Sequence, residues 1–335
     1  MEKKKDYRAL TSLKGLFILI IAVHNTLTIT PLFSSVPGTA FIRLFGGFLG
    51  NSMFFILSGF LFSLGYKHRI QEHSVSFPEF LLRRLKKLYP MYILSNGVAL
   101  LIEIGHYGVS AINLNKIVLT ALMIGGPYNN PTWFLFVLFA CYILFYGICY
   151  FAKSSTHYMV YITAAVFVGY TLMDADLKIL FLRSGYGTAY LNFFLGCILA
   201  EIYPVISEKQ HRWLQPLLII LLPLLLLLLL SYGVEIIAGD VRIAFSFLIC
   251  PMILYLALVK GPCSRILQWK GFVALGQISS SIFFWHMVLY FIFCDVYTAI
   301  ARTDSIQEPQ YILYFVLMIV CSAALTKSGK RKGSL

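Results

Sequence analysis

Near its start the chain carries the stretch Gly15-Leu-Phe-Ile-Leu-Ile-Ile-Ala-Val-His24-Asn-Thr-Leu-Thr-Ile-Thr30, an uncharged run that contains one imidazole. The run follows a basic segment, residues 1–8, and such a pairing is typical of a helix that enters a lipid bilayer. No small-residue cleavage site follows, so we expect a membrane anchor rather than a removed signal peptide. Ionisable residues in membrane spans are costly and usually face a bundle interior, a cavity or a substrate path. His24 is therefore the first candidate functional residue.

The composition of the whole chain indicates an integral membrane protein. Of 335 residues, 59% are hydrophobic and only 12% are charged, and the mean hydropathy is +0.80. Soluble domains average about 25% charged residues. No soluble stretch is long enough to form a second domain. We therefore predict a single membrane domain over residues 1–335, with a core at about 8–326 and a basic cytoplasmic tail at 327–335.

Ten stretches are long and apolar enough to cross a bilayer, which takes about 17–25 residues. A further apolar piece, 116–126, is too short to span. The fifth span is short, and the ninth holds a cluster of serines. The predicted fold is all-α and polytopic, with about ten transmembrane helices. The predicted spans cover residues 13–31, 44–65, 88–105, 132–151, 158–174, 187–203, 214–232, 242–259, 272–294 and 310–326.

The distribution of Lys and Arg predicts how the spans are oriented. The positive-inside rule favours a cytoplasmic N-terminus and, with an even number of spans, a cytoplasmic C-terminus. The same bias accounts for the net charge of +13, so the basic composition does not indicate nucleic-acid binding. In this orientation the outer segments hold only six of the 27 basic residues, namely Arg43, Lys116, Lys178, Arg183, Arg242 and Arg302.

The seven cysteines are scattered, mostly inside the apolar spans. Their spacing matches neither a metal site nor a redox motif, so we expect buried apolar side chains, no metal ion and no bound cofactor.

His24 is the candidate catalytic residue. It lies ten residues after Lys14, which corresponds to about 15 Å along a helix. Lys14 would stand at the cytoplasmic interface, and His24 near mid-membrane or beyond. A neutral imidazole can accept a proton from a hydroxyl at working pH. The alternative is a structural histidine that forms hydrogen bonds between helices.

A second candidate is the basic segment Phe80-Leu-Leu-Arg-Arg-Leu-Lys-Lys-Leu-Tyr-Pro90 at the cytoplasmic mouth of the third span. On a helix Arg83 and Lys87 share a face, as do Arg84 and Lys87. Such cations, with Lys86 beside them, can hold anionic phosphates. The alternative is a topology anchor near anionic lipid headgroups.

Three residues at the predicted outer side are candidates for acceptor contacts. Trp133 starts the fourth span, where a tryptophan is usually an interfacial anchor but can also stack on a sugar ring. His286 is expected in the outer half of the ninth span, and the alternative to an acceptor contact is a structural role. Glu103 is expected near the outer end of the third span, and the alternative is a carboxylate that faces water. Ser58-Gly59 indicates a close helix contact rather than a nucleophile, because no Gly-x-Ser-x-Gly elbow is present.

Taken together, these segments resemble the acyltransferase 3 family of membrane-bound acyltransferases across nearly the whole chain. The order and spacing of the segments make the resemblance specific. They are Leu13-Lys-Gly-Leu-Phe-Ile-Leu-Ile-Ile-Ala-Val-His24, Phe54-Phe-Ile-Leu-Ser-Gly-Phe-Leu61, Phe80 to Pro90, Trp133-Phe-Leu135, and Leu275-Gly-Gln-Ile-Ser279 to His286.

The resemblance implies a ten-helix acyltransferase 3 domain that takes an acyl group, most often acetyl, from coenzyme A on the cytoplasmic side. It implies that His24 is essential and that Arg83 and Arg84 serve donor binding or catalysis. Lys14 and Lys87 stand where the family has arginine, so charge is kept but forked geometry is lost. The hydrolase-like domain fused to some members is missing from this sequence, which suggests a separate extracytoplasmic partner.

We therefore expect an O-acyltransferase that uses acetyl-CoA as its donor. The expected acceptor is a hydroxyl of a cell-envelope glycan or polysaccharide at the outer face, and this acceptor is either lipid-linked or free. The expected location is a bacterial plasma membrane. The alternative from another class is a transporter or flippase of a glycan or lipid-linked intermediate. A polytopic chain with a mid-membrane histidine fits that too, although no internal repeat or pair of interrupted helices is evident. A structural or regulatory membrane subunit is a third reading.

Overall fold

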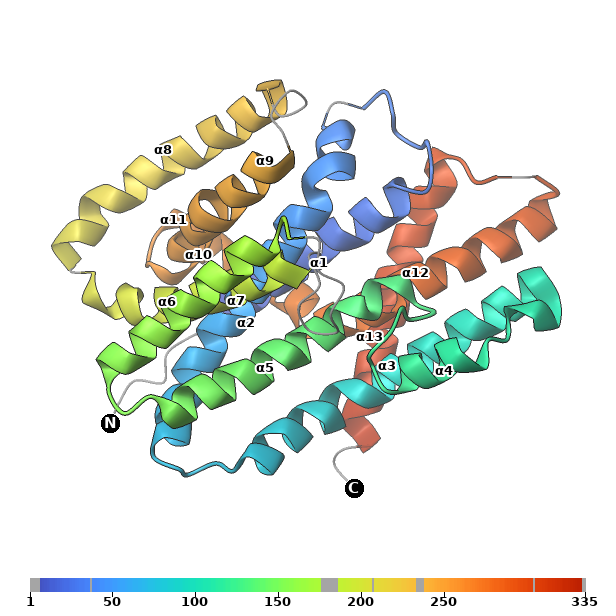
Figure 1. Cartoon of the computed structure of the whole chain (residues 1–335). Coiled ribbons are helices and arrows are strands. Elements are labelled where there is room, and N and C mark those ends of the chain that lie inside the picture. The colour runs from blue at the N-terminus through green and yellow to red at the C-terminus, as the bar shows by residue number, and fades with distance from the viewer. Residues whose placement is uncertain are drawn as a thin grey trace. The chain divides into compact units, whose positions relative to one another are not determined.

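The computed structural model describes residues 7–36, 38–175, 186–206, 208–232, 238–303 and 305–332. Every regular element within these residues is helical (Figure 1). The all-α prediction is therefore confirmed. Lys178 and Arg183, which entered the predicted charge distribution, lie outside the described residues.

Seven α-helices precede residue 203. A short 3-10 turn, η1 (Gly108–Ala111), comes before α4, and another, η2 (Asn130–Thr132), leads directly into α5. Pro90 lies inside α3. The seven helices are α1 (Arg8–Leu27), α2 (Thr39–Gln71), α3 (Phe77–Tyr107), α4 (Leu114–Ala121), α5 (Trp133–Phe151), α6 (Ser155–Leu172) and α7 (Gly187–Ile202).

Six further α-helices follow a 3-10 turn, η4, at Tyr203–Val205. A π-helical segment, Phe245–Ile249, joins α9 to α10, just before Pro251 removes a backbone donor. The six helices are α8 (Glu208–Tyr232), α9 (Ala238–Ala244), α10 (Cys250–Leu258), α11 (Pro262–Leu267), α12 (Lys270–Ala301) and α13 (Glu308–Lys332).

Nine helical segments within the described residues are long and apolar enough to cross a membrane, and they overlap nine of the ten predicted spans. The remaining prediction, 158–174, coincides with α6, which forms a helix of 18 residues. By helical rise α6 is about 27 Å long, close to the thickness of a bilayer core. Its polar opening, Ser155-Thr156-His157, lowers its hydropathy and explains why it falls outside the apolar set. The piece at 116–126 is the short helix α4, too short to span, as predicted.

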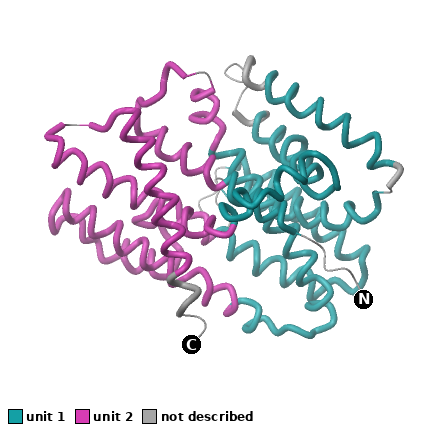
Figure 2. The backbone as a smooth tube through the Cα atoms, turned by 180° about the vertical axis from the view of Figure 1, so that it is seen from behind, with its two compact units in different colours: residues 1–17, 47–81, 137–276 teal, residues 18–46, 82–136, 277–335 magenta. Residues whose placement is uncertain are grey.

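The chain divides into two compact units, and the divisions fall inside helices (Figure 2). Unit 1 comprises residues 1–17, 47–81 and 137–276, and unit 2 comprises residues 18–46, 82–136 and 277–335.

Unit 1 contains close helix contacts made through glycine. A Cβ on Gly59 of α2 would overlap the carbonyl oxygen of Phe193 on α7, and a Cβ on Gly196 would overlap that of Ile56. Gly276 of α12 meets the backbone of Thr11 on α1 in the same way. Small residues permit helices to approach this closely in membranes, where packing rather than burial from water drives association. The predicted contact at Ser58-Gly59 is thus confirmed.

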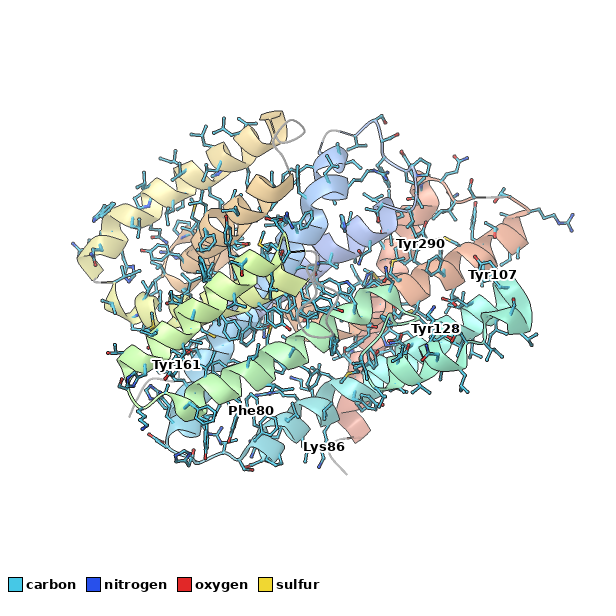
Figure 3. All side chains as sticks on the ribbon, in the orientation of Figure 1. Phe80, Lys86, Tyr107, Tyr128, Tyr161 and Tyr290 are labelled. Carbon is cyan, nitrogen blue, oxygen red and sulfur yellow. The ribbon has the colours of Figure 1, made fainter. Side chains whose placement is uncertain are left out.

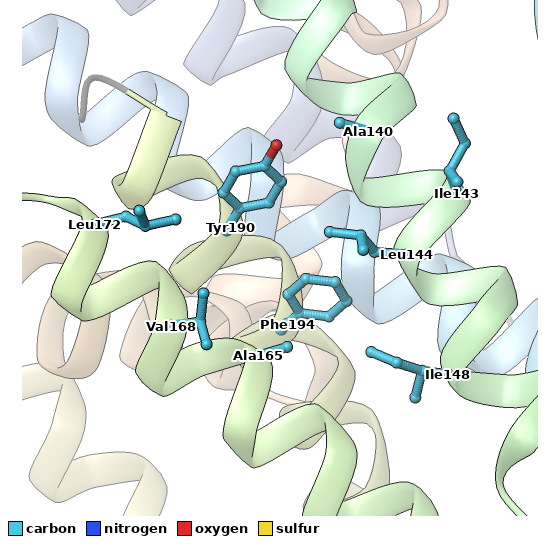
Figure 4. Close-up of a pocket in the computed structure, with 9 residues that line it drawn as sticks. All are labelled: Ala140, Ile143, Leu144, Ile148, Ala165, Val168, Leu172, Tyr190 and Phe194. Carbon is cyan, nitrogen blue, oxygen red and sulfur yellow. The ribbon is translucent and has the colours of Figure 1, made fainter. Parts of the chain in front are cut away.

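An apolar cavity of about 390 Å³ lies between α5, α6 and α7 of unit 1 (Figure 4). Its side chains are aliphatic or aromatic, and Tyr190 supplies the single hydroxyl group. They are Ala140, Ile143, Leu144, Ile148, Ala165, Val168, Leu172, Tyr190 and Phe194.

In unit 2 a buried polar network joins α3, the η2 turn and α12. Asn96 donates to Thr132 Oγ1 at 3.1 Å, and its Oδ1 accepts from the backbone N–H of Asn129 at 2.9 Å. Asn129 in turn donates to the carbonyl oxygen of Phe284 on α12 at 2.7 Å. Such a network holds the start of α5 and the middle of α12 in one arrangement, because each buried polar group needs a partner.

Candidate active site

His24 is held in one orientation by the backbone of α2. Its Nδ1 lies 2.9 Å from the carbonyl oxygen of Ile42. A carbonyl only accepts, so in the neutral ring Nδ1 donates and Nε2 keeps a lone pair. No described residue forms a hydrogen bond with Nε2. Gly46 leaves room for the ring, since a Cβ there would lie 3.1 Å from His24 Cβ. The half-buried imidazole is therefore arranged as a proton acceptor.

The next residue of α1 connects to the buried His286 of α12. His286 Nδ1 lies 2.9 Å from the carbonyl oxygen of Phe283, so this nitrogen donates and Nε2 accepts. Asn25 Nδ2 donates to that Nε2 at 3.0 Å. Both ring nitrogens of His286 are thus engaged within the protein, and its carbonyl accepts from the Tyr314 hydroxyl at 2.9 Å. The hydrogen bond from Asn25 links His286 to α1, and an acceptor-side role for His286 remains a prediction.

Arg43 closes the end of α1, and sequence reasoning missed this role. Its Nη1 donates to the carbonyls of Leu27 and Thr30, and its Nη2 donates to that of Leu32 at 2.5 Å. The last carbonyls of a helix lack intrahelical partners and carry partial negative charge. The Arg43 guanidinium therefore stabilises the Leu27 carbonyl both as a hydrogen-bond donor and as a positive charge. The only signal in the sequence was a lone arginine in a predicted outer segment. Arg43 comes directly after Ile42, whose carbonyl orients His24.

A second contact on α1 fixes the same turn. Thr26 Oγ1 lies 2.6 Å from the hydroxyl of Tyr311 on α13, and both side chains are buried. The turn around His24 is therefore held by hydrogen bonds to α2, α12 and α13 within unit 2. This orientation by neighbours is what a general base requires.

Two of the predicted acceptor-side residues lie in other contacts of unit 2. Glu103 forms an ion pair with Lys116 at 3.3 Å. The Lys116 ammonium lies 3.9 Å from the ring centre of Tyr128, which Figure 3 labels. Trp133, the first residue of α5, is half-buried and lies edge-on to Phe134. The hydrogen bonds of Glu103 and His286 thus go to different partners, Lys116 and Asn25.

The predicted donor-binding cations lie on two helices. Arg83, Arg84 and Lys87 follow one another along α3, and Figure 3 marks Lys86 among them. Arg83 and Lys87 are exposed, while Arg84 is half-buried. Lys14 is half-buried on α1, in unit 1, whereas the α3 cations belong to unit 2. The phosphate-binding role of these four residues remains a prediction.

Unit 1 contains a charged pair that sequence reasoning also missed. The buried Lys67 ammonium of α2 lies 2.7 Å from Glu201 Oε2 of α7 and 4.5 Å from the ring centre of Tyr158 on α6. The positive-inside analysis counts Lys67 only as one of the cytoplasmic basic residues. Because its side chain is buried, Lys67 also connects α2, α6 and α7. Among the described residues no group of three or more His, Cys, Asp or Glu side chains is placed to hold a metal ion.

The fold and this histidine together describe a polytopic α-helical membrane protein whose first span carries an oriented imidazole. A model of the acyltransferase 3 family, described as an acyltransferase domain, matches residues 7–327. The chain therefore belongs to the acyltransferase 3 family and is a membrane acyltransferase. This confirms the predicted family and favours acyl transfer over the transporter alternative. Neither the curated proteins nor the solved structures give a match to the chain.

Proposed function

We propose that this acyltransferase moves an acyl group, most simply acetyl, from cytoplasmic acyl-CoA to a hydroxyl of a cell-envelope glycan at the outer face. The donor is a co-substrate, and the acceptor is a free or lipid-linked polysaccharide. The observation that carries the proposal is the orientation of His24, whose Nδ1–H is committed to Ile42 while Nε2 is left to accept a proton. The positive-inside bias supports cytoplasmic termini. The location proposed with this acceptor is a bacterial plasma membrane.

In this reaction His24 Nε2 accepts the proton of the acceptor hydroxyl as its oxygen attacks the thioester carbonyl carbon. The carbon–sulfur bond breaks, the ester forms, and the coenzyme A thiolate leaves and takes up a proton. A second route passes the acyl group through His24 itself. Nε2 attacks the thioester and the coenzyme A thiolate leaves and takes up a proton. The acceptor hydroxyl then attacks the acyl-imidazole, the bond between the acyl carbon and Nε2 breaks, and the freed Nε2 takes up the hydroxyl proton. Both routes need the same free lone pair.

The other predicted site residues are assigned supporting roles. Arg83, Arg84, Lys87 and Lys14 are candidates for the phosphates of the donor. Trp133 and Glu103 are candidates for the acceptor side, and His286 acts there through Asn25, which it holds at 3.0 Å. A separate extracytoplasmic partner that presents the acceptor is part of the same proposal.

The test uses membranes that contain the wild-type chain, His24→Ala or His106→Ala, with radiolabelled acetyl-CoA and an envelope-glycan fraction. His106 is a matched control because it is an exposed histidine of unit 2 whose partner is Asp295. Loss of a general base lowers rates by about 10²–10⁴-fold. We expect alkali-labile label on glycan with wild type and His106→Ala, and near-background label with His24→Ala. Full activity of His24→Ala would overturn the assignment.

The same material separates the two routes. Without acceptor, an acyl-imidazole route leaves label on the wild-type protein after rapid quenching, and His24→Ala carries none. A general-base route leaves the protein unlabelled. Coenzyme A release with other thioesters then identifies the acyl group if acetyl gives no product.

A further inference from the structure

A second cavity of unit 1, about 670 Å³, opens where several candidate spans end. Its walls come from the start of α1, from α2, from η4 and from the segment that runs from the end of α10 through α11. The candidate spans end at Val205 and Leu258, and α1 begins at Arg8. The Lys and Arg distribution assigns this end of the spans to the cytoplasm.

The lining of this cavity combines cations with rings. Lys260 and Arg265 both line it, both are exposed, and neither has a side-chain hydrogen bond or ion pair among the described residues. Tyr7 and Tyr203 contribute aromatic surface, and Gln268 adds an amide. No Asp or Glu of the described residues belongs to the lining. Unpaired cations beside aromatic faces suit a ligand that carries phosphates and a planar base.

The walls of the cavity are held in place before any ligand arrives. Ser12 of α1 donates to the carbonyl of Leu267 at the end of α11, at 2.5 Å. Ser264 and the backbone of Gly261 exchange hydrogen bonds at the start of α11. The Tyr203 hydroxyl donates to the carbonyl of Leu258 at 3.2 Å, which fixes its ring. The volume falls within the range of about 300–1,000 Å³ that is usual for small-molecule sites.

We propose that this cavity, rather than Lys14 and the cations of α3, binds the nucleotide end of the acyl-CoA donor, with Lys260 and Arg265 at its phosphates and Tyr7 or Tyr203 against the adenine. The inference rests on the proposed function, because that function supplies the donor. Neither this cavity nor the apolar one of Figure 4 is lined by Arg83, Arg84 or Lys87. An anionic lipid headgroup shares the phosphate chemistry. The nucleotide is favoured because the cavity offers rings as well as charge.

The first test measures binding of coenzyme A to the purified full chain in nanodiscs of neutral lipid. The variants are Lys260→Ala, Arg265→Ala, the double variant and Lys153→Ala, an exposed cation of unit 1 that lies outside the cavity lining. Charge-assisted contacts to phosphate are strong, so we expect the double variant to weaken binding at least about tenfold. Lys153→Ala should bind like wild type, and Arg265→Lys should retain part of the affinity. Elution as a single monodisperse peak checks folding.

Two further measurements test whether the 3′-phosphate of coenzyme A is bound and whether the bound phosphate belongs to the nucleotide or to a lipid headgroup. Acetyl-3′-dephospho-CoA should show a raised KM with wild type and a smaller further rise in the double variant, because the lost contacts overlap. Anionic lipid should not compete with coenzyme A. Equal coenzyme A affinity of wild type and double variant would overturn the inference while leaving the acyl-transfer proposal standing. Competition by anionic lipid would assign the cavity to headgroups instead. A wild-type chain that neither binds coenzyme A nor transfers acyl groups would overturn both.

Discussion

The Lys67–Glu201 pair should respond unequally to removal of its two partners. The Lys67 side chain is 4% exposed and the Glu201 side chain 29%. Glu201→Gln therefore leaves a cation that water cannot reach, whereas Lys67→Met leaves an anion that can be partly hydrated. Breaking a buried pair from one side costs about 3–5 kcal/mol. We expect Glu201→Gln to fall in that range and Lys67→Met to cost about 1–3 kcal/mol.

The measurement is the apparent melting temperature of the detergent-solubilised chain by fluorescence-detected size exclusion, read as a rank order at matched heating rates. The double variant Lys67→Met/Glu201→Leu removes both charges and should lie near or above wild type. Asp295→Asn is the control. It breaks the exposed His106–Asp295 pair, with side chains 42% and 47% exposed, and should cost about 0–1 kcal/mol. Equal losses for the two single variants, or a larger loss for Lys67→Met, would refute the reasoning.

Three further outcomes are expected. Gly59→Ala should lower stability by about 1–3 kcal/mol because its Cβ meets the backbone of α7. Gly65→Ala should leave stability unchanged, because a Cβ there meets nothing within 4 Å. Equal melting temperatures of the two variants would contradict the close contact at Gly59. Arg43→Met should lower kcat and leave the donor KM nearly unchanged, because the last carbonyl of α1, at Leu27, and the carbonyls of Thr30 and Leu32 after it lose their donor. Kinetics of acyl transfer check this, and an unchanged kcat would exclude a positioning role. Asn25→Leu should lower kcat about as much as His286→Leu, and the double variant little further, since the two act as one contact; additive losses would speak against it.

The transmembrane character and most span positions could be predicted because hydropathy is a local property. Apolar runs near 20 residues have few alternatives in a bilayer, where every backbone group must be satisfied within its own helix. The glycine contact at Ser58-Gly59 was predictable for a related reason, since small residues mark close crossings. The segment 242–259 shows the limit, because nothing in its apolar pattern indicates the π-helical turn at Phe245–Ile249.

Hydropathy and the order of the motifs were enough to identify an all-helical membrane acyltransferase. They also singled out His24, because an imidazole in hydrocarbon is costly. The packing of the helices was needed to show which nitrogen of His24 meets a carbonyl and which residues hold its helix. Asn25 and His286 are 261 residues apart, and Lys67 and Glu201 are 134 apart. Such partners meet because packed helices bring distant turns together. A charge or an amide in a sequence therefore indicates a need for a partner, and packing decides which partner meets it.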